Sequence, residues 1–210
     1  INFTDLTLSE GELNLTVYCK DTLGNEGQDN LTFIINDYNS ANEIAKLLAS
    51  DGVADDWFGY AVSISGNYGV VGSYGNDDDG ADSGSIYVYE LNNTNNWTYV
   101  TKLTASDGAA YDYFGEVVAI SGNSVVVGSR LDDDNGDGSG SAYVFERNST
   151  GNWTEVTKLL ASDGDASDYF GRSVSISGDY STVGAYGYSG GTQIGTVYVF
   201  ERNLTGNWTE

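Results

Sequence analysis

The sequence predicts an all-β protein in which a four-stranded antiparallel unit is repeated three times. A motif centred on a Phe-Gly pair recurs at residues 58–59, 114–115 and 170–171, with a period of 56 residues (114 − 58 and 170 − 114). A fixed period of this length is typical of a repeat architecture. The chain also has 28 Gly and 16 Tyr and no Pro. Such a composition suits short, half-buried strands that are separated by tight turns.

Residues 1–37 differ from the repeats and predict two strands joined by a long hairpin. Leu13, Leu15, Val17 and Cys19 alternate with polar residues, and a second alternating run spans residues 30–35. This period of two is the pattern of a strand with one buried face. We expect Cys19 to point inward as a small core side chain rather than to act as a reactive thiol.

The first 37 residues carry a resemblance of their own. The pattern L-N-L-T-V-Y-C-K-D-T-L-G-N followed by L-T-F-I-I-N-D resembles the last two strands of an immunoglobulin-like module of prokaryotic surface proteins. This resemblance implies a partial immunoglobulin-like β-sandwich at 1–37, a linker at 38–45 and the three repeats at 46–210. We expect the chain to be a piece of a longer secreted precursor.

Each repeat is expected to contain four strands. In the first repeat they cover 58–65, 69–73, 85–90 and 97–105, and the spacing predicts the same strands in the later copies. Ile44–Ala49 is expected to be the fourth strand of a unit whose first three strands are missing. Four short antiparallel strands, repeated radially with Gly and aromatic landmarks, are typical of the blades of a β-propeller.

The repeats resemble a known family. The elements F-G, S-G and V-G-S or V-G-A, in this order before a Gly-rich loop, resemble the FG-GAP repeat, which is the blade unit of integrin α-chain heads and of many prokaryotic surface proteins. The resemblance spans 46–210 and implies an extracellular or cell-surface protein with a role in adhesion. The proline of the G-A-P element is absent, and the acidic loop follows the second strand instead of the first. The resemblance therefore implies the blade rather than a metal site.

The formal net charge of −23 limits the possible partners. Nucleic acids and anionic membranes attract Lys and Arg, so both are disfavoured as partners. Cations are the expected ligands, although acidity also serves solubility alone. The sequence contains no apolar run of the length that spans a bilayer.

The acidic loop after the second strand is the candidate calcium site. Clustered carboxylates with a Gly that permits a tight turn supply the oxygen ligands that Ca²⁺ prefers. The alternative is a solvated acidic turn, and the third repeat has no acid in this loop. The candidate ligands are Asp77, Asp78, Asp79, Asp82, Asp132, Asp133, Asp134 and Asp137.

A second acidic set recurs in every repeat as two Asp residues five positions apart. We expect these side chains to accept hydrogen bonds from backbone N–H groups of the loop between blades, with metal binding as the alternative. The pairs are Asp51 and Asp56, Asp107 and Asp112, and Asp163 and Asp168.

The acceptor pattern for N-glycosylation, N-x-[ST], occurs nine times. Its frequency predicts a glycoprotein, whereas the alternative is that Asn serves only to form turns. The acceptors are Asn2, Asn14, Asn30, Asn92, Asn96, Asn148, Asn152, Asn203 and Asn207.

The composition gives little support for a catalytic function. The chain has no His and one Cys, so the common pairs of nucleophile and base are missing. Paired carboxylates would suit glycoside hydrolysis, but they recur in each repeat. The N-W-T landmark at Trp97, Trp153 and Trp208 is expected to pack between blades, with stacking on sugars as the alternative.

The sequence therefore predicts a non-enzymatic extracellular protein with a structural or adhesive role. Its expected partners are other copies of itself or further repeats of the same chain, and surface glycans or proteins. One alternative is a subunit of an extracellular filament or surface layer that is joined by strand exchange. The other is a non-catalytic segment of a polysaccharide-active enzyme.

Overall fold

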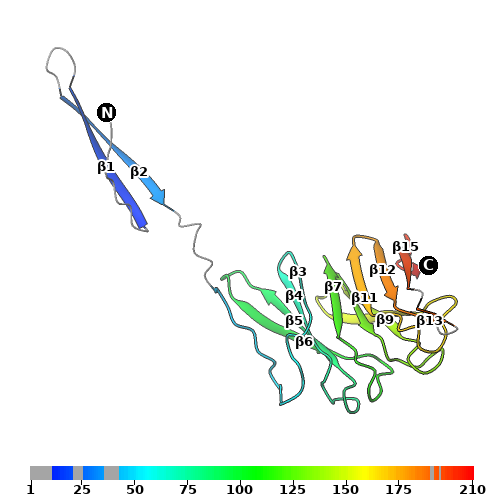
Figure 1. Ribbon diagram of the computed structural model, residues 1–210. Coiled ribbons are helices and arrows are strands. Elements are labelled where there is room, and N and C mark those ends of the chain that lie inside the picture. Colours follow the sequence, from blue (N-terminus) through cyan, green and yellow to red (C-terminus); the bar gives the residue numbers. More distant parts are fainter. Residues whose placement is uncertain (1–10, 21–25, 36–42, 190–191, 194) are drawn as a thin grey trace. The chain divides into compact units, whose positions relative to one another are not determined.

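The computed structural model describes residues 11–20, 26–35, 43–189, 192–193 and 195–210 (Figure 1). The chain divides into two compact units, Ile1–Lys46 and Leu47–Glu210. All regular elements among the described residues are β-strands, which confirms the predicted fold class. The described part of the chain contains no helix that is long and apolar enough to cross a membrane.

The first unit contains one antiparallel pair of strands. β1 (Gly11–Lys20) pairs with β2 (Glu26–Ile35), and Leu15 lies opposite Leu31. Pairing continues to Lys20 opposite Glu26, so the connection is shorter than the long hairpin that we expected. The side chains of β1 and β2 lie outside the described part of the structure. The immunoglobulin-like module and the inward position of Cys19 therefore stay predictions.

The second unit contains three four-stranded antiparallel sheets, which we call blades 1, 2 and 3 (Figure 1). In each blade the strands lie side by side in sequence order, as predicted. A further short ladder, β13 (Tyr188–Ser189) with β14 (Thr192–Gln193), precedes β15. Blade 1 consists of β3 (Val62–Ser65), β4 (Tyr68–Ser73), β5 (Ser85–Leu91) and β6 (Trp97–Leu103); blade 2 of β7 (Val117–Ser121), β8 (Ser124–Ser129), β9 (Ser141–Arg147) and β10 (Trp153–Leu159); and blade 3 of β11 (Ser173–Ser177), β12 (Tyr180–Ala185), β15 (Thr196–Arg202) and β16 (Trp208–Thr209).

The Phe-Gly pair does not belong to the first strand of the blade, contrary to our prediction for 58–65. It precedes that strand, and the Gly residues at 59, 115 and 171 have φ values of 90°, 87° and 85°. These values lie in the left-handed region, which extended strands do not use and which Gly adopts without a Cβ clash. The pair therefore forms a turn, and in blades 2 and 3 this turn places the Phe ring in the interface with the preceding blade.

The predicted strand at Ile44–Ala49 was wrong, because residues 43–49 are not part of any ladder. A fourth strand needs the third strand of its own blade as a hydrogen-bond partner, and the described residues before 44 provide none. The segment instead packs on blade 1. Leu47 and Ala49 contact the cluster around Tyr87 and Tyr89, and the Tyr89 hydroxyl donates to the carbonyl of Leu48 at 2.8 Å.

The hydrophobic core lies between the blades rather than within one sheet. One cluster joins Val70, Ile86 and Val88 of blade 1 to Phe114 and Val127 of blade 2. A second cluster joins the corresponding side of blade 2 to Phe170, Val183 and Phe200 of blade 3. Each blade therefore depends on its neighbour to bury its apolar residues.

Two of the three Trp landmarks pack between blades, as predicted, whereas Trp97 is partly buried against the Tyr87 and Tyr89 cluster of blade 1. Trp153 is buried in the cluster between blades 1 and 2, with its ring edge-on to Tyr68 at a centroid distance of 5.7 Å. Trp208 is buried in the cluster between blades 2 and 3. A Trp that is buried in this way is not accessible for stacking on sugars.

Close backbone approach explains other repeated glycines. A Cβ on Gly128 would lie 2.0 Å from the carbonyl oxygen of Gly171, and a Cβ on Gly140 would lie 2.1 Å from that of Phe170. In blade 1, Gly72 and Gly84 face the next blade at the same distance of 2.0 Å. A side chain at any of these four positions would push two neighbouring blades apart.

Candidate functional site

Each acidic loop is folded by its own side chains. In blade 1, Asp77 Oδ1 accepts from the N–H of Asp82 at 2.8 Å. In blade 2, Asp133 Oδ1 accepts from the N–H of Gly138 at 2.8 Å, and the hydroxyl of Ser139 accepts from the N–H of Asn135 at 3.0 Å. Asp77 and Asp133 therefore act as local caps that close the turn, which is a common use of Asp in loops.

A lysine of the fourth strand lies among the carboxylates of blade 2. The Nζ atom of Lys158 is 2.8 Å from Asp107, 2.9 Å from Asp132 and 2.7 Å from Asp134. Asp132 is buried, and its carboxylate also accepts from the hydroxyl of Tyr143 at 2.7 Å. One ammonium group thus neutralises the centre of the cluster, where unpaired carboxylates would repel each other.

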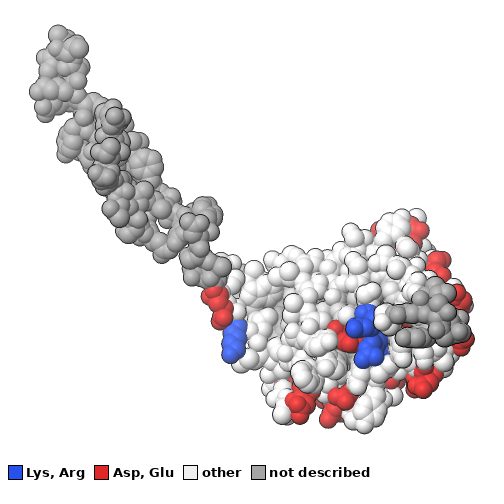
Figure 2. Space-filling view, viewed as in Figure 1, with Lys and Arg blue, Asp and Glu red and all other residues white. Residues whose placement is uncertain are grey.

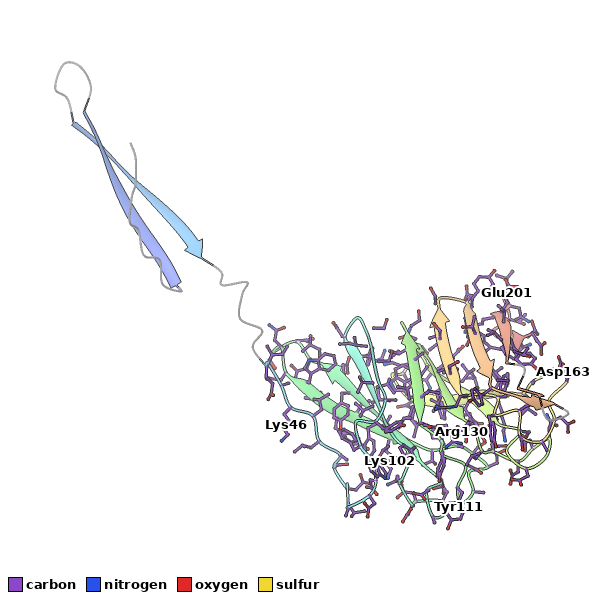
Figure 3. The ribbon with its side chains drawn as sticks, in the orientation of Figure 1. Lys46, Lys102, Tyr111, Arg130, Asp163 and Glu201 are labelled. Atoms are coloured by element: carbon purple, nitrogen blue, oxygen red, sulfur yellow. The ribbon has the colours of Figure 1, made fainter. Side chains whose placement is uncertain are left out.

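Blade 1 repeats this arrangement with fewer acids around Lys102, which is labelled in Figure 3. Lys102 forms ion pairs with Asp51 and Asp78, whose side chains are half exposed. Asn76 takes the place of Asp132 and is likewise buried. In blade 3, whose loop carries no acid, the described residues keep the hydrogen bond between Tyr198 and Asp163 at 2.6 Å.

These contacts change the acid–base properties of the cluster. Burial alone would lower the pKa of Lys158, but hydrogen bonds to Asp107, Asp134 and Asp132 outweigh it and raise the pKa above its usual range. Burial and the hydrogen bond to Asp51 raise the pKa of Tyr87 to about 12. Lys158 in blade 2 is therefore charged, and Tyr87 in blade 1 is neutral, at any physiological pH.

The second acidic set serves the loops between blades, as expected for one member of each pair. Asp56, Asp112 and Asp168 each accept from a backbone N–H three residues earlier, at 2.9, 2.7 and 2.8 Å. The other members, Asp51, Asp107 and Asp163, instead accept from tyrosine hydroxyls. Our expectation of backbone partners was wrong for these three, because the hydroxyl group of the tyrosine in the third strand lies within hydrogen-bonding distance and donates to them.

Asp112 is the one carboxyl in the described residues whose pKa is markedly raised. Burial raises this pKa from an ordinary value of 3.8 to about 6, and the nearby carboxylates of Asp132 and Asp133 add to the effect. The hydrogen bond from the N–H of Ala109 opposes the shift. The Asp112 carboxylate is hydrogen-bonded to the backbone of a loop between blades. We therefore attribute its raised pKa to its burial in the fold rather than to a catalytic role.

The variant Asp112→Asn is expected to stabilise the fold near pH 7. Because the pKa is raised in the folded state, the unfolded chain ionises first as pH rises from about 4 to about 6, and the folded state loses stability over this window. Below pH 4 the wild type and the variant should be similar. At pH 7 the variant should gain on the order of 2 kcal/mol in the free energy of unfolding, since the amide oxygen still accepts from Ala109. Denaturant unfolding at both pH values measures the difference, and an equal effect at both would contradict it.

Five of the predicted calcium ligands are engaged by groups of the protein itself. Asp78, Asp132 and Asp134 bond the lysines, and Asp77 and Asp133 cap the loop. Within residues that the structure describes, there is no group of three or more acidic, Cys or His side chains that could hold a metal ion. Asp79, Asp82 and Asp137 lie in the same loops, where acidic side chains mark the edge of the second unit (Figure 2).

The loop between the third and fourth strands gives the repeated Asn residues a structural role. The side-chain oxygen of Asn92 accepts from the N–H and hydroxyl of Thr94 and from the N–H of Asn96, at 2.7 to 3.0 Å. Asn148 and Asn203 form the same turn in blades 2 and 3. The second acceptor of each pair, Asn96, Asn152 or Asn207, is exposed. Asn2, Asn14 and Asn30 lie outside the side chains that the structure describes.

The role of Lys102 and Lys158 was missed by sequence reasoning. Both lysines belong to the repeated element K-L-x-A-S-D-G, which served only as a landmark of the period. The available signal was the combination of a repeated Lys, a repeated Asp five positions later and an acidic loop. The residues that meet in blade 2 span 107–158, so the fold had to be known before they could be placed together.

The comparison with protein families matches the repeated region. The model of the FG-GAP repeat matches three segments, residues 41–89, 97–145 and 153–200, which together cover more than half of the chain. The second and third segments begin in the outer strand of one blade and end in the third strand of the next. Each sequence repeat therefore links two neighbouring blades. No curated protein matches the chain.

Proposed function

Because the chain belongs to the FG-GAP repeat family, we propose that it is a non-enzymatic extracellular protein with a structural or adhesive role. FG-GAP repeats are typical of extracellular or surface proteins. The observation that supports the proposal best is that a lysine of the fourth strand engages the inner carboxylates beside each of the two acidic loops. Lys158 holds three carboxylates in blade 2, and Lys102 holds two in blade 1.

A glycosidase needs one carboxylic acid that keeps its proton near neutral pH and a second carboxylate at a suitable distance across the substrate. In blade 2 the carboxylates of Asp132 and Asp134 are both ion-paired with Lys158 and do not stand apart across an open site. Asp112 has the raised pKa, but it is buried and bonded to backbone. This arrangement favours a scaffold over the polysaccharide-active enzyme that we kept as an alternative.

Incubation of the chain with neutral and acidic polysaccharides tests the proposal. We expect retention of the chain on some surface glycans or proteins and no release of reducing ends over many hours. Heat-unfolded chain is the control for nonspecific retention. Release of new reducing ends that is lost in Asp112→Asn would contradict the proposal and support the enzyme.

We propose calcium as an additional stabiliser of the acidic loops. The lysines already neutralise the inner carboxylates, so calcium would bind the outer oxygens of these loops and its effect on the wild type should be small. In Lys158→Met the inner site is vacated, and calcium should then raise the melting temperature by several degrees more than in the wild type. Asp78→Ala combined with Asp134→Ala should weaken the response. Equal melting curves with calcium and with chelator in both proteins would contradict the proposal.

We also propose glycosylation at the exposed acceptors Asn96, Asn152 and Asn207. These side chains are exposed in the loop between the third and fourth strands of each blade, so they are accessible for modification. Intact mass before and after enzymatic removal of N-glycans, on protein from its native source, tests this proposal. A mass equal to that of the bare sequence would contradict it.

A further inference from the structure

The stack of blades has two outer faces that differ from each other. We call the side of blade 3 that is turned away from blade 2 the rear face, and define it by Gly184, Gly195, Val197 and Val199. The side of blade 1 that is turned away from blade 2 is the front face, and it contains Phe58, Val62, Ile64 and Trp97. We propose that the front face of one copy of this chain packs on the rear face of a second copy, and that it repeats there the interface found between blades.

The apolar residues of the rear face are exposed where their counterparts are buried. Val199 is 55% exposed and Val197 is 67% exposed. The equivalent residues of blades 1 and 2, Val88 and Val144, are completely buried under the following blade. The rear face thus exposes apolar side chains of the kind that are buried between blades at the equivalent positions.

One glycine of the rear face, Gly195, is not explained by the contacts found within one chain. Gly84 and Gly140 are needed because a Cβ would collide with the carbonyl of the next blade's Phe. At the equivalent position, Gly195, the nearest atom of the described residues to an added Cβ is the carbonyl oxygen of Ala185 at 3.5 Å. Gly195 is therefore free of the constraint that explains glycine in the other two repeats. A neighbouring blade would restore that constraint.

A hollow lies where the neighbour's Phe-Gly turn would sit. It has a volume of about 200 Å³, and its lining includes Gly184, Gly195 and Val197. In blade 1 the corresponding positions, Gly72 and Gly84, lie directly against the backbone of the Phe114-Gly115 turn. The hollow on blade 3 is thus the receiving half of the contact that holds blades 1 and 2 together.

The front face contains the residues for the other side of the same contact, and they are more exposed than their equivalents in blade 2. Ile64 is 67% exposed, whereas its equivalent in blade 2, Ile120, is 7% exposed. Trp97 is only partly buried, although Trp153 and Trp208 are covered by the preceding blade. A hollow of about 310 Å³ between Leu47, Val62, Ile64 and Trp97 remains on this side.

The polar groups on the two faces also correspond. Between blades, Ser65 Oγ accepts from the N–H of Gly122 at 3.0 Å and Ser121 Oγ accepts from that of Gly178 at 3.1 Å. The next step in this series pairs Ser177 with the N–H of Gly66 in a second copy. At one charged position the two faces are compatible, because Arg172 of the rear face would lie opposite the uncharged Tyr60, as Glu116 lies opposite Arg172 within the chain.

A second copy is the occupant that these observations support, because one chain carries both halves of an interface that it already forms twice. The two halves differ, so the contact is head-to-tail and leads either to a ring or to an open chain of copies. Two copies that meet at both pairs of faces would contain twice three, or six, blades. This number lies within the range of about four to eight blades in closed propellers.

Sedimentation of the full chain and of two variants tests the proposal. Ile64→Asp disables only the front face and Val199→Asp only the rear face, and both residues are exposed in one chain, so neither change disturbs the fold. We expect the wild type to form pairs or longer chains, most strongly at ~1 M salt, where the repulsion from the net charge of −23 is screened. Each variant alone should associate at least about 100-fold more weakly.

The mixture of the two variants is the decisive sample. Each variant keeps one intact face, so an equimolar mixture should form one-to-one pairs and nothing larger. Leu204→Asp, at an exposed position outside both faces, should associate as the wild type does. Unchanged circular dichroism and melting of the isolated variants establish that they are folded. A wild type that stays a single chain at all concentrations, or a single variant that still associates like the wild type, would overturn the proposal.

Discussion

Lys158→Met is expected to lower the free energy of unfolding of the second unit by about 3 kcal/mol. The substitution keeps most of the volume of the side chain and removes the ammonium group that contacts Asp107, Asp132 and Asp134. Asp132 is buried, so its carboxylate cannot turn to water when its partner is lost. Removal of one partner from a buried ion pair leaves a charge in a medium of low polarity, and this is the main source of the loss.

Lys102→Met is the matched control for this prediction. The same exchange in blade 1 removes an ammonium group from Asp51 and Asp78, which are both half exposed and can be solvated. We expect a loss of about 1 kcal/mol or less, as for an exposed ion pair. Denaturant unfolding of the two variants at neutral pH gives both values. Equal losses would mean that burial of Asp132 is not the cause.

Gly140→Ala is expected to destabilise the interface between blades 2 and 3 by about 3 kcal/mol or more. The new methyl group would lie 2.1 Å from the carbonyl oxygen and 2.6 Å from the amide nitrogen of Phe170, and backbone atoms cannot move aside as a side chain can. Gly140 also has a φ of 79°, which is unfavourable for Ala. The substitution therefore forces the Phe170 turn out of its place in the core.

Gly195→Ala provides the comparison. It is the same exchange at the equivalent position of blade 3, where the nearest atom is 3.5 Å away. A change within about 0.5 kcal/mol of the wild type is expected for the isolated chain. Thermal unfolding at low protein concentration measures both variants. A large loss in Gly195→Ala, or none in Gly140→Ala, would contradict this account of the repeated glycines.

The sequence was sufficient to predict the blades because each signal is local and is repeated. Short apolar segments such as 86–89 recur at a fixed period between Gly-rich turns, and this indicated the strands of each blade. The Phe-Gly turn was misplaced because Phe58 continues the apolar pattern of the strand. Only the positive φ of Gly59 separates the turn from the strand, and no pattern of side chains reveals it.

The site was less predictable, because it depends on which loops meet. The Asp residues of 132–134 were identified as a cluster that needs a cation, and the structure places a cation there. The cation is a lysine from β10, which is distant in sequence and is brought near by the pairing of β9 with β10. A carboxylate cluster therefore predicts that a positive charge lies nearby, but the fold determines which group supplies that charge.

A crystal structure of the chain grown with excess calcium tests the central claim most directly. This claim is that a lysine, rather than a metal ion or a substrate, neutralises the inner carboxylates of each acidic loop. We predict the Lys158 Nζ atom within hydrogen-bonding distance of Asp107, Asp132 and Asp134, with any calcium confined to the outer oxygens of the loop. A calcium ion among these three carboxylates, with Lys158 turned to solvent, would contradict the claim.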